Sequence, residues 1–361
     1  MRVQFLVADL NMFGGGERVA VNLAAGFSKW FGYEVEVVSI QRITNPLPFS
    51  IPPEVQIRSV DLDLHSAGIA AKAYSRARAF LCAPTVLAET KPSIVLGIGT
   101  FPNLILSLLT RSTVKKVGCE HNWFGAPALY WRILRRFLYR NLDSLVVLTD
   151  AAKKDARGLN SKILVIPNSS PFDNPQKANL YSKKILAVGR LEYQKGFDRL
   201  IEAFSKIASD YPDWTLELFG EGPSEVSLKK KVKALGLSDQ ITINRPTFKI
   251  DREYQNASFL VLTSRYEGLP MVLIEALCFG LPAIAFDCQN GPREIIVNGE
   301  TGYLVAAGDV DEFANRMAQL ITSSEIREKM SENSLRHAKN FSLEHICKTW
   351  KNHFDNLVGL N

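Results

Sequence analysis

The sequence lacks the features that mark several protein classes. It has only 5 cysteines in 361 residues, and no two of them form a paired motif. We therefore expect reduced, buried thiols, as in cytosolic proteins, and neither disulfides nor a cysteine metal site. No apolar run is long enough to span a bilayer, and the first residues predict a strand instead of a signal peptide. These absences predict a cytoplasmic location.

The composition is that of an ordinary folded protein, with 46% apolar and 22% charged residues, and the length suggests two domains. The net charge of +6 is uneven. Residues 1–173 hold 20 Lys and Arg against 13 Asp and Glu, and the remainder holds 23 against 24. This excess predicts a polyanionic partner for the first half: an anionic membrane surface, a phosphate-bearing substrate or nucleic acid. Because no recognition motif accompanies it, we expect no nucleic-acid partner.

The stretch 259–280 is the one around which the second half is organised. Residues 259–263 predict an apolar strand, a loop follows, and Pro270 suits the first position of a helix that Gly280 ends. Glu267 then precedes the helix and Glu275 lies within it. A strand, a loop and a helix start form a suitable place for an anion or a sugar phosphate. The alternative is a core helix with one surface acid at each end.

A second strand–loop–helix unit opens the chain. Three glycines at 14–16 let a backbone approach a phosphate closely, although such glycines also serve tight turns. The dinucleotide fingerprint is not met, because Val19 stands where a further glycine is required. Asp61 and Asp63 form an Asp-x-Asp that we interpret as the end of a strand, and not as a metal site.

Two helices of the first half are basic. The helix at 67–88 carries Lys72, Arg76 and Arg78, and the helix at 127–141 mixes arginines with aromatic residues. Such mixing suits an anionic lipid interface. A solvated basic face explains the helix at 67–88 equally well, and one core-facing stripe with one charged stripe explains the helix at 127–141 equally well.

His121 follows a predicted strand at 114–119. Open α/β sheets bind ligands at the carboxyl ends of their strands, although a lone histidine is more often structural. Strands and helices alternate through both halves, which predicts two parallel, doubly wound sheets. Residues 168–179 predict a linker, and we expect a ligand in a central cleft between the domains.

The motifs of the second half occur in a specific order. They are GRLEYQKG at 189–196, FGEGP at 219–223, EGLPMVLIEA at 267–276 and GETGYLV at 299–305, and the last of them predicts a short hairpin. The first half adds GGGER at 14–18, EHN at 120–122 and IPNS at 166–169. With them the chain resembles glycosyltransferase family 4, a retaining family with the GT-B fold.

The resemblance implies an α/β architecture in which two Rossmann-like domains face a central cleft. It implies an acceptor-binding domain at 1–170, a nucleotide-sugar-binding domain at 177–341, and a C-terminal helix at about 342–361 that packs back on the first domain. Activity without a metal or any other cofactor is also implied.

The resemblance also implies roles for particular residues. Arg190 and Lys195 are expected to hold the donor diphosphate, where negative charge grows as the glycosidic bond breaks. Glu275 is expected to bind the ribose hydroxyls. Glu267 is expected to bind the donor sugar, and His121 to contact that sugar. The catalytic set is therefore Arg190, Lys195, Glu267 and His121.

Further donor-binding residues follow from the same motifs. The backbone amides of residues 268–271 are expected to help bind the sugar, the glycines at 14–16 to close over the diphosphate, and the 247–248 pair to seat the base. These residues are Gly14, Gly15, Gly16, Thr247, Phe248, Gly268, Leu269, Pro270 and Met271.

Within the family, the chain is most similar to bacterial enzymes that extend polyprenyl-diphosphate-linked glycans, such as N-acetylgalactosaminyltransferases and capsule or exopolysaccharide transferases. This implies transfer of a hexose or N-acetylhexosamine from a nucleotide sugar, UDP-linked first of all, to a lipid-diphosphate-linked glycan. Lys72, Arg76 and Arg78 would bind the acceptor diphosphate, and the protein would lie peripherally on the inner face of the plasma membrane. The alternatives are a GT-B epimerase or phosphorylase and a non-catalytic sugar-nucleotide-binding protein.

Overall fold

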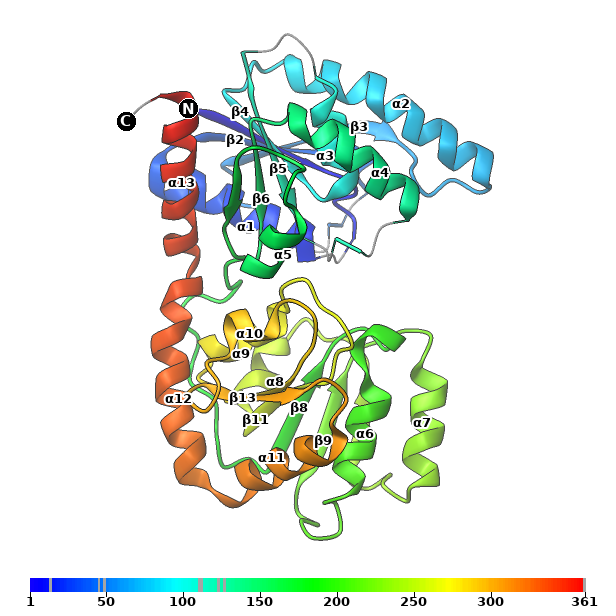
Figure 1. The fold of residues 1–361 in the computed structure, drawn as a ribbon, viewed down its shortest axis with the longest axis vertical. Coiled ribbons are helices and arrows are strands. Elements are labelled where there is room, and N and C mark those ends of the chain that lie inside the picture. Colours follow the sequence, from blue (N-terminus) through cyan, green and yellow to red (C-terminus); the bar gives the residue numbers. More distant parts are fainter. Residues whose placement is uncertain are drawn as a thin grey trace. The chain divides into compact units, whose positions relative to one another are not determined.

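The computed structural model describes residues 1–12, 15–44, 46–47, 50–109, 113–121, 124–125 and 128–359. The chain divides into two compact units: Met1–Pro171 with Leu343–Asn361, here unit 1, and Phe172–Ser342, here unit 2. Each unit is a parallel sheet covered by helices on both faces, so the expected pair of doubly wound domains is confirmed (Figure 1).

The sheet of unit 1 has seven strands in the order β3-β2-β1-β4-β5-β6-β7, and all neighbours are parallel. Its strand order reverses between β1 and β4, which are paired although two strands separate them in the sequence. This reversal is the topological switch point of the unit. The strands are β1 (Arg2–Val7), β2 (Glu34–Gln41), β3 (Val55–Leu62), β4 (Ile94–Ile98), β5 (Lys115–Glu120), β6 (Ser144–Val147) and β7 (Ile163–Val165).

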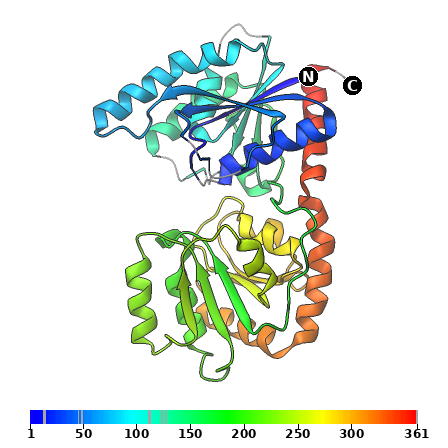
Figure 2. The same cartoon turned by 180° about the vertical axis from the view of Figure 1, so that it is seen from behind.

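Two apolar clusters of unit 1 cover the two faces of this sheet. One is formed with α1 and α13, which lie side by side in both views (Figure 1 and Figure 2), and the rings of Phe27 and Phe354 are 5.3 Å apart there. The other includes residues of α2 and α3. The helices are α1 (Gly15–Phe31), α2 (Ile69–Ala88), α3 (Thr100–Ser107), α4 (Leu129–Leu138), α5 (Asp150–Asp155) and α13 (Leu343–Val358).

The sheet of unit 2 has six parallel strands in the order β10-β9-β8-β11-β12-β13, with its switch point between β8 and β11. The strands are β8 (Lys184–Val188), β9 (Thr215–Phe219), β10 (Ile241–Asn244), β11 (Phe259–Leu262), β12 (Ala283–Asp287) and β13 (Gly302–Ala306). The helices are α6 (Phe197–Ser205), α7 (Glu225–Ala234), α8 (Ile250–Gln255), α9 (Met271–Cys278), α10 (Pro292–Ile295), α11 (Val310–Thr322) and α12 (Ser324–Ala338).

Two details of unit 2 differ from the sequence-based expectation. The segment at 299–305 predicts a hairpin, but β13 is an edge strand parallel to β12. A hairpin would make neighbouring strands antiparallel, so the prediction was wrong. The helix expected from Pro270 begins one residue later, because Pro270 has an extended backbone and caps the helix.

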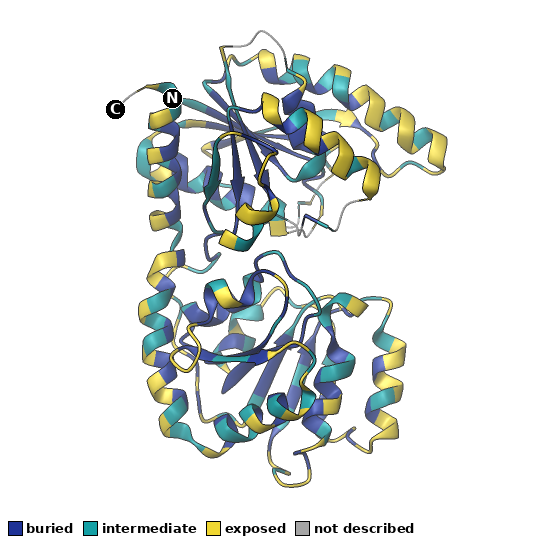
Figure 3. Ribbon diagram, viewed as in Figure 1, coloured by how far each residue is buried: buried dark blue, intermediate teal, exposed yellow. Residues whose placement is uncertain are grey.

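Burial follows the layers, with the strands buried and the outer faces of the helices exposed (Figure 3). In unit 1, α2 and α4 expose large apolar side chains, among them Ile69, Tyr74, Leu81, Leu129, Tyr130, Ile133 and Phe137. Among the helices that the structure describes, none is both long and apolar enough to cross a membrane.

Candidate functional site

Two loops meet at the switch point of unit 2. Residues 189–196 follow β8, and residues 263–270 follow β11, the strand paired with β8. Because both strands are parallel, both loops leave the same edge of the sheet, where α/β folds bind ligands. The predicted residues Arg190, Lys195 and Glu267 lie on these two loops.

Glycines occupy the positions where these loops touch, and a side chain there would clash with the neighbouring backbone. A Cβ on Gly220 would lie 1.9 Å from the Gly189 carbonyl oxygen. A Cβ on Gly196 would lie 2.1 Å from the Thr263 carbonyl oxygen, and Gly196 has a φ of +65°. No other residue fits either position without moving backbone. The glycines of these motifs therefore bring three loops into direct contact.

Lys195 and Glu267 form an ion pair across the two loops. The Lys195 Nζ lies 2.7 Å from Glu267 Oε1, and the Ser264 hydroxyl donates to the same oxygen at 2.6 Å. The two side chains are only 14% and 7% exposed. Screening by water is weak there, so the charges are held in place before any ligand arrives.

The second predicted cation is placed differently. Arg190 has a side chain that is 73% exposed, and it pairs with Glu192 at 2.8 Å. It lies five residues from Lys195 on the same loop but does not share its ion pair. The structure thus offers one fixed cation and one solvent-exposed cation on this loop.

Arg265 is a residue that the sequence-based analysis missed. Its guanidinium donates to both carboxylate oxygens of Asp198, at 2.9 and 2.7 Å, and lies 4.0 Å from the centre of the Tyr193 ring. Burial alone would raise the pKa of Asp198, but the hydrogen bonds and charge of Arg265 hold it below its ordinary value. This bidentate pair ties the loop after β11 to the first turn of α6, which directly follows the loop of Lys195.

The remaining predicted donor residues of unit 2 lie on neighbouring loops and on α9. Glu275 is buried on α9 and accepts a hydrogen bond from the Tyr254 hydroxyl at 2.6 Å. Gly268, Leu269, Pro270 and Met271 lead into α9. On the loop after β10, the Thr247 hydroxyl accepts from the Lys249 amide at 3.1 Å, and Phe248 is 87% exposed.

His121 lies directly after β5 in unit 1. Both ring nitrogens are buried, and neither has a hydrogen-bond partner among the described residues. Burial lowers the pKa of His121 to about 4, so the imidazole is neutral at pH 7. Such a ring has one donor and one acceptor to offer. Gly15 and Gly16 begin α1, whereas Gly14 and Asn122 lie outside the described residues.

The residue before His121 is a buried carboxylate that the sequence-based analysis did not assign. Glu120 accepts hydrogen bonds from the Thr100 and Tyr139 hydroxyls, with the Arg135 guanidinium 3.8 Å away. Burial raises the pKa of Glu120 in spite of the Arg135 charge. The cluster fixes the end of β5 to α3 and to the segment after α4.

A cavity of about 270 Å³ opens at the switch point of unit 1, and Lys72 and Arg76 line it. Its other lining residues come from the ends of β1, β3 and β4 and from α4: Ala8, Asp9, Leu64, His65, Thr100, Phe101 and Trp131. Arg78 lies about 200° further round α2 than Arg76 and stacks on Tyr74 at 5.9 Å. The structure therefore brings two of the three predicted acceptor cations together.

Within the described ranges, no three His, Cys, Asp or Glu side chains form a group that could hold a metal ion.

Comparison with known sequences extends over nearly the whole chain. A profile for "Glycosyltransferase Family 4" matches residues 13–169, and one for "Glycosyl transferases group 1" matches residues 169–337. The amylovoran biosynthesis glycosyltransferase AmsD of Erwinia amylovora is 34% identical over 256 residues, which are 68% of this chain and 72% of AmsD.

A second relative matches end to end. An α-1,4-N-acetyl-D-galactosaminyltransferase of Campylobacter jejuni, named for a diphosphate-linked undecaprenol glycan, is 26% identical over 360 residues, 97% of each chain. Among solved structures, TarM of S. aureus in a complex that contains UDP has a TM-score of 0.83 at 14% identity, covering 98% of this chain and 99% of TarM. This likeness confirms the expected GT-B fold.

Proposed function

We propose that this chain, which belongs to the glycosyltransferases and has the GT-B fold, transfers a hexose or N-acetylhexosamine from a UDP-sugar to a lipid-diphosphate-linked glycan. The transfer retains the anomeric configuration and serves bacterial glycan assembly. The observation that carries the proposal is the buried Lys195–Glu267 pair at the switch point of unit 2.

The proposed chemistry centres on the leaving diphosphate. As the bond to the anomeric carbon breaks, negative charge grows on the phosphate oxygen, and a cation already in position lowers the barrier without having to reorganise. Lys195 meets this requirement because Glu267 and the loop glycines fix it. Arg190, exposed on the same loop, supplies the second cation, and no metal is needed in this scheme.

The sugar and the nucleoside are recognised by polar groups with defined positions. Glu267 and the backbone amides of residues 268–271 bind the donor sugar, and Glu275 binds the ribose hydroxyls. Thr247 and the exposed ring of Phe248 seat the base. His121 contacts a sugar hydroxyl, which would satisfy ring nitrogens that have no partner among the described residues. The glycines at 14–16 approach the diphosphate.

The acceptor proposal depends on unit 1 and on the Campylobacter relative, whose name includes a diphosphate-linked undecaprenol. Lys72 and Arg76 bind the acceptor diphosphate in the cavity. Arg78, on another face of α2, contributes charge toward an anionic leaflet. Exposed apolar side chains on α2 and α4, interspersed with arginines, support a peripheral location on the inner face of the plasma membrane.

A binding panel tests the donor proposal. Thermal unfolding is measured with UDP-, GDP- and ADP-sugars and no added metal, because a ligand that binds the folded protein raises its melting temperature. We expect one UDP-sugar to stabilise the protein and Arg190→Ala/Lys195→Ala to abolish the shift. Lys229→Ala, on an exposed ion pair of α7, is the matched control. Turnover of the donor without an acceptor would favour an epimerase or phosphorylase instead.

A further inference from the structure

We propose that the cavity of unit 1 is a binding site for one sugar ring, namely the sugar of the acceptor glycan that carries the diphosphate. The inference rests on the proposed function and adds the residues that recognise this sugar: Asp9, His65, Thr100, Phe101 and Trp131. The cavity lies where residues 8–9 leave β1 and residues 100–101 follow β4, which is the switch point of the sheet.

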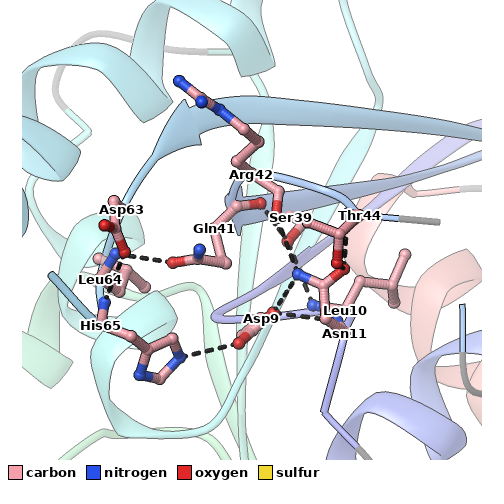
Figure 4. A network of polar contacts seen from close by, with 10 residues as sticks. All are labelled: Asp9, Leu10, Asn11, Ser39, Gln41, Arg42, Thr44, Asp63, Leu64 and His65. Atoms are coloured by element: carbon pink, nitrogen blue, oxygen red, sulfur yellow. Dashed lines mark hydrogen bonds and ion pairs between the residues drawn. The ribbon is translucent and has the colours of Figure 1, made fainter.

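The polar wall of the cavity is an Asp–His pair. Asp9 is 6% exposed, and its Oδ2 lies 2.8 Å from Nε2 of His65 (Figure 4). The side chain of His65 is 61% exposed and lines the cavity. Because a carboxylate only accepts, Nε2–H of His65 donates to Asp9, and the carboxylate oxygens and Nδ1 of the imidazole can accept hydrogen bonds from adjacent hydroxyls of a pyranose.

The Asp–His pair is held in place from both sides. Oδ1 of Asp9 accepts hydrogen bonds from the backbone and side-chain amides of Asn11, at 2.9 and 2.7 Å, and Asn11 is tied in turn to Thr44. The backbone amide of His65 donates to Asp63 at 3.0 Å. The groups are therefore ordered before a ligand binds, which reduces the entropic cost of binding.

The lining of the cavity also has an aromatic wall, formed by Phe101 and Trp131. The rings of Phe101 and Trp131 are 5.9 Å apart with an edge-on geometry, and Phe101 packs edge-on against Phe80 at 5.7 Å. An aromatic ring held in place by such packing suits the apolar C–H face of a sugar ring. Thr100 adds a hydroxyl whose position is fixed by the buried Glu120.

Besides the Asp–His pair and the aromatic rings, two cations line the cavity. Lys72 and Arg76 are one helical turn apart on α2, so their side chains leave the helix on the same face. An aromatic wall, an Asp–His pair and two cations together match a sugar joined to phosphate. The volume of about 270 Å³ lies at the small end of ligand sites, which indicates one ring and not an oligosaccharide.

Calorimetric titration with simple probes tests this site. The full chain, saturated with UDP to occupy the donor locus, is titrated with α-glucose, α-galactose, α-GlcNAc and α-GalNAc 1-phosphates. Methyl phosphate is the probe that carries the charge without the ring. We expect at least one sugar phosphate to bind tenfold or more tightly than methyl phosphate.

Variants assign the added affinity to the two walls. Trp131→Ala and His65→Gln should each lower the affinity for the sugar phosphate at least fivefold and change that for methyl phosphate less than twofold. Lys72→Ala should weaken both probes. Phe137→Ala, which removes a 60% exposed ring of α4 outside the cavity, is the control and should change neither.

The outcomes separate this proposal from the donor proposal. Equal affinity for all probes, or unchanged sugar-phosphate binding in both Trp131→Ala and His65→Gln, overturns the sugar site even if UDP still raises the melting temperature. Absence of any effect of UDP overturns the donor proposal but leaves the titration readable, because the probes are then tested without UDP. An unchanged melting temperature of Trp131→Ala and His65→Gln shows that the variants fold.

Discussion

The Lys195–Glu267 pair allows structural and catalytic contributions to be separated by a double-mutant cycle. Lys195→Met keeps the aliphatic stem of the side chain but removes the charge that pairs with Glu267, whose side chain is 7% exposed. Among the described side chains, the Ser264 hydroxyl is then the one hydrogen-bond partner left to that carboxylate. Breaking a buried pair costs about 3–5 kcal/mol when one charge stays unpaired. Because Ser264 still donates and Lys195 is 14% exposed, we expect about 2–3 kcal/mol of lost unfolding free energy.

Removing the second charge should restore stability but not activity. In Lys195→Met/Glu267→Gln no buried charge is left unpaired, so the coupling free energy between the two changes should be about 2 kcal/mol. Transfer should stay at least 100-fold below the wild type, as when one preorganised donor to a developing charge is removed. Unfolding is followed in urea on the transition that UDP shifts, because two domains need not unfold in one step.

An exposed pair provides the control for this cycle. Lys229 and Glu225 on α7 are also 2.7 Å apart, but their side chains are 56% and 27% exposed. We expect a coupling too small to measure there. A coupling of the same small size for Lys195 and Glu267, or recovery of transfer in the double variant, would refute the assignment of Lys195 as a fixed, catalytically essential cation.

Three further predictions follow from single positions. Gly196→Ala should lower the unfolding free energy by more than 2 kcal/mol and Gly236→Ala by about 1 kcal/mol, as measured in urea, because both have positive φ but only Gly196 has a backbone oxygen within 2.1 Å of the added Cβ. His353 is buried with a pKa of about 4, so the unfolded chain binds more protons than the folded chain between pH 6.5 and 4. The unfolding free energy should therefore decrease as the pH is lowered through this range, by up to about 1.4 kcal/mol per pH unit. His353→Gln should remove that part of the pH dependence. Arg265→Lys loses the bidentate contact to Asp198 and should lower kcat with little change in melting temperature; an unchanged kcat would show that the contact does not position Lys195.

Much of the fold was predictable because local pattern and global topology agree. Alternating apolar strands and amphipathic helices predict a parallel sheet whose crossover helices cover it, and two restarts of this pattern predict two such sheets. The segment at 299–305 misled because a short apolar run between glycines indicates a turn, whereas only the sheet shows that Gly302 begins an edge strand. A Cβ on Gly302 would lie 2.0 Å from the Ala283 carbonyl oxygen, which is a contact that no sequence pattern reveals.

The site was predictable only where motifs mark it. The family resemblance implied donor roles for both Lys195 and Glu267, but their direct ion pair depends on the adjacency of β8 and β11. Arg265 lies within the organising stretch and was overlooked, because its partner Asp198 is 67 residues away in the sequence. Asp9 and His65 are 56 residues apart and belong to no motif, so only the folded sheet brings them together.

An assay of sugar transfer to lipid tests the proposed function most directly. Purified protein is incubated with radiolabelled UDP-sugars and a bacterial lipid extract, and label is measured in the butanol-soluble, mild-acid-labile fraction, where diphosphate-linked glycans are found. We expect label from one UDP-sugar, an α-linked product from an α-linked donor, and a rate of transfer at least 100-fold lower in Lys195→Met. Undiminished transfer by Lys195→Met, or labelled product of inverted configuration, would contradict the proposed function.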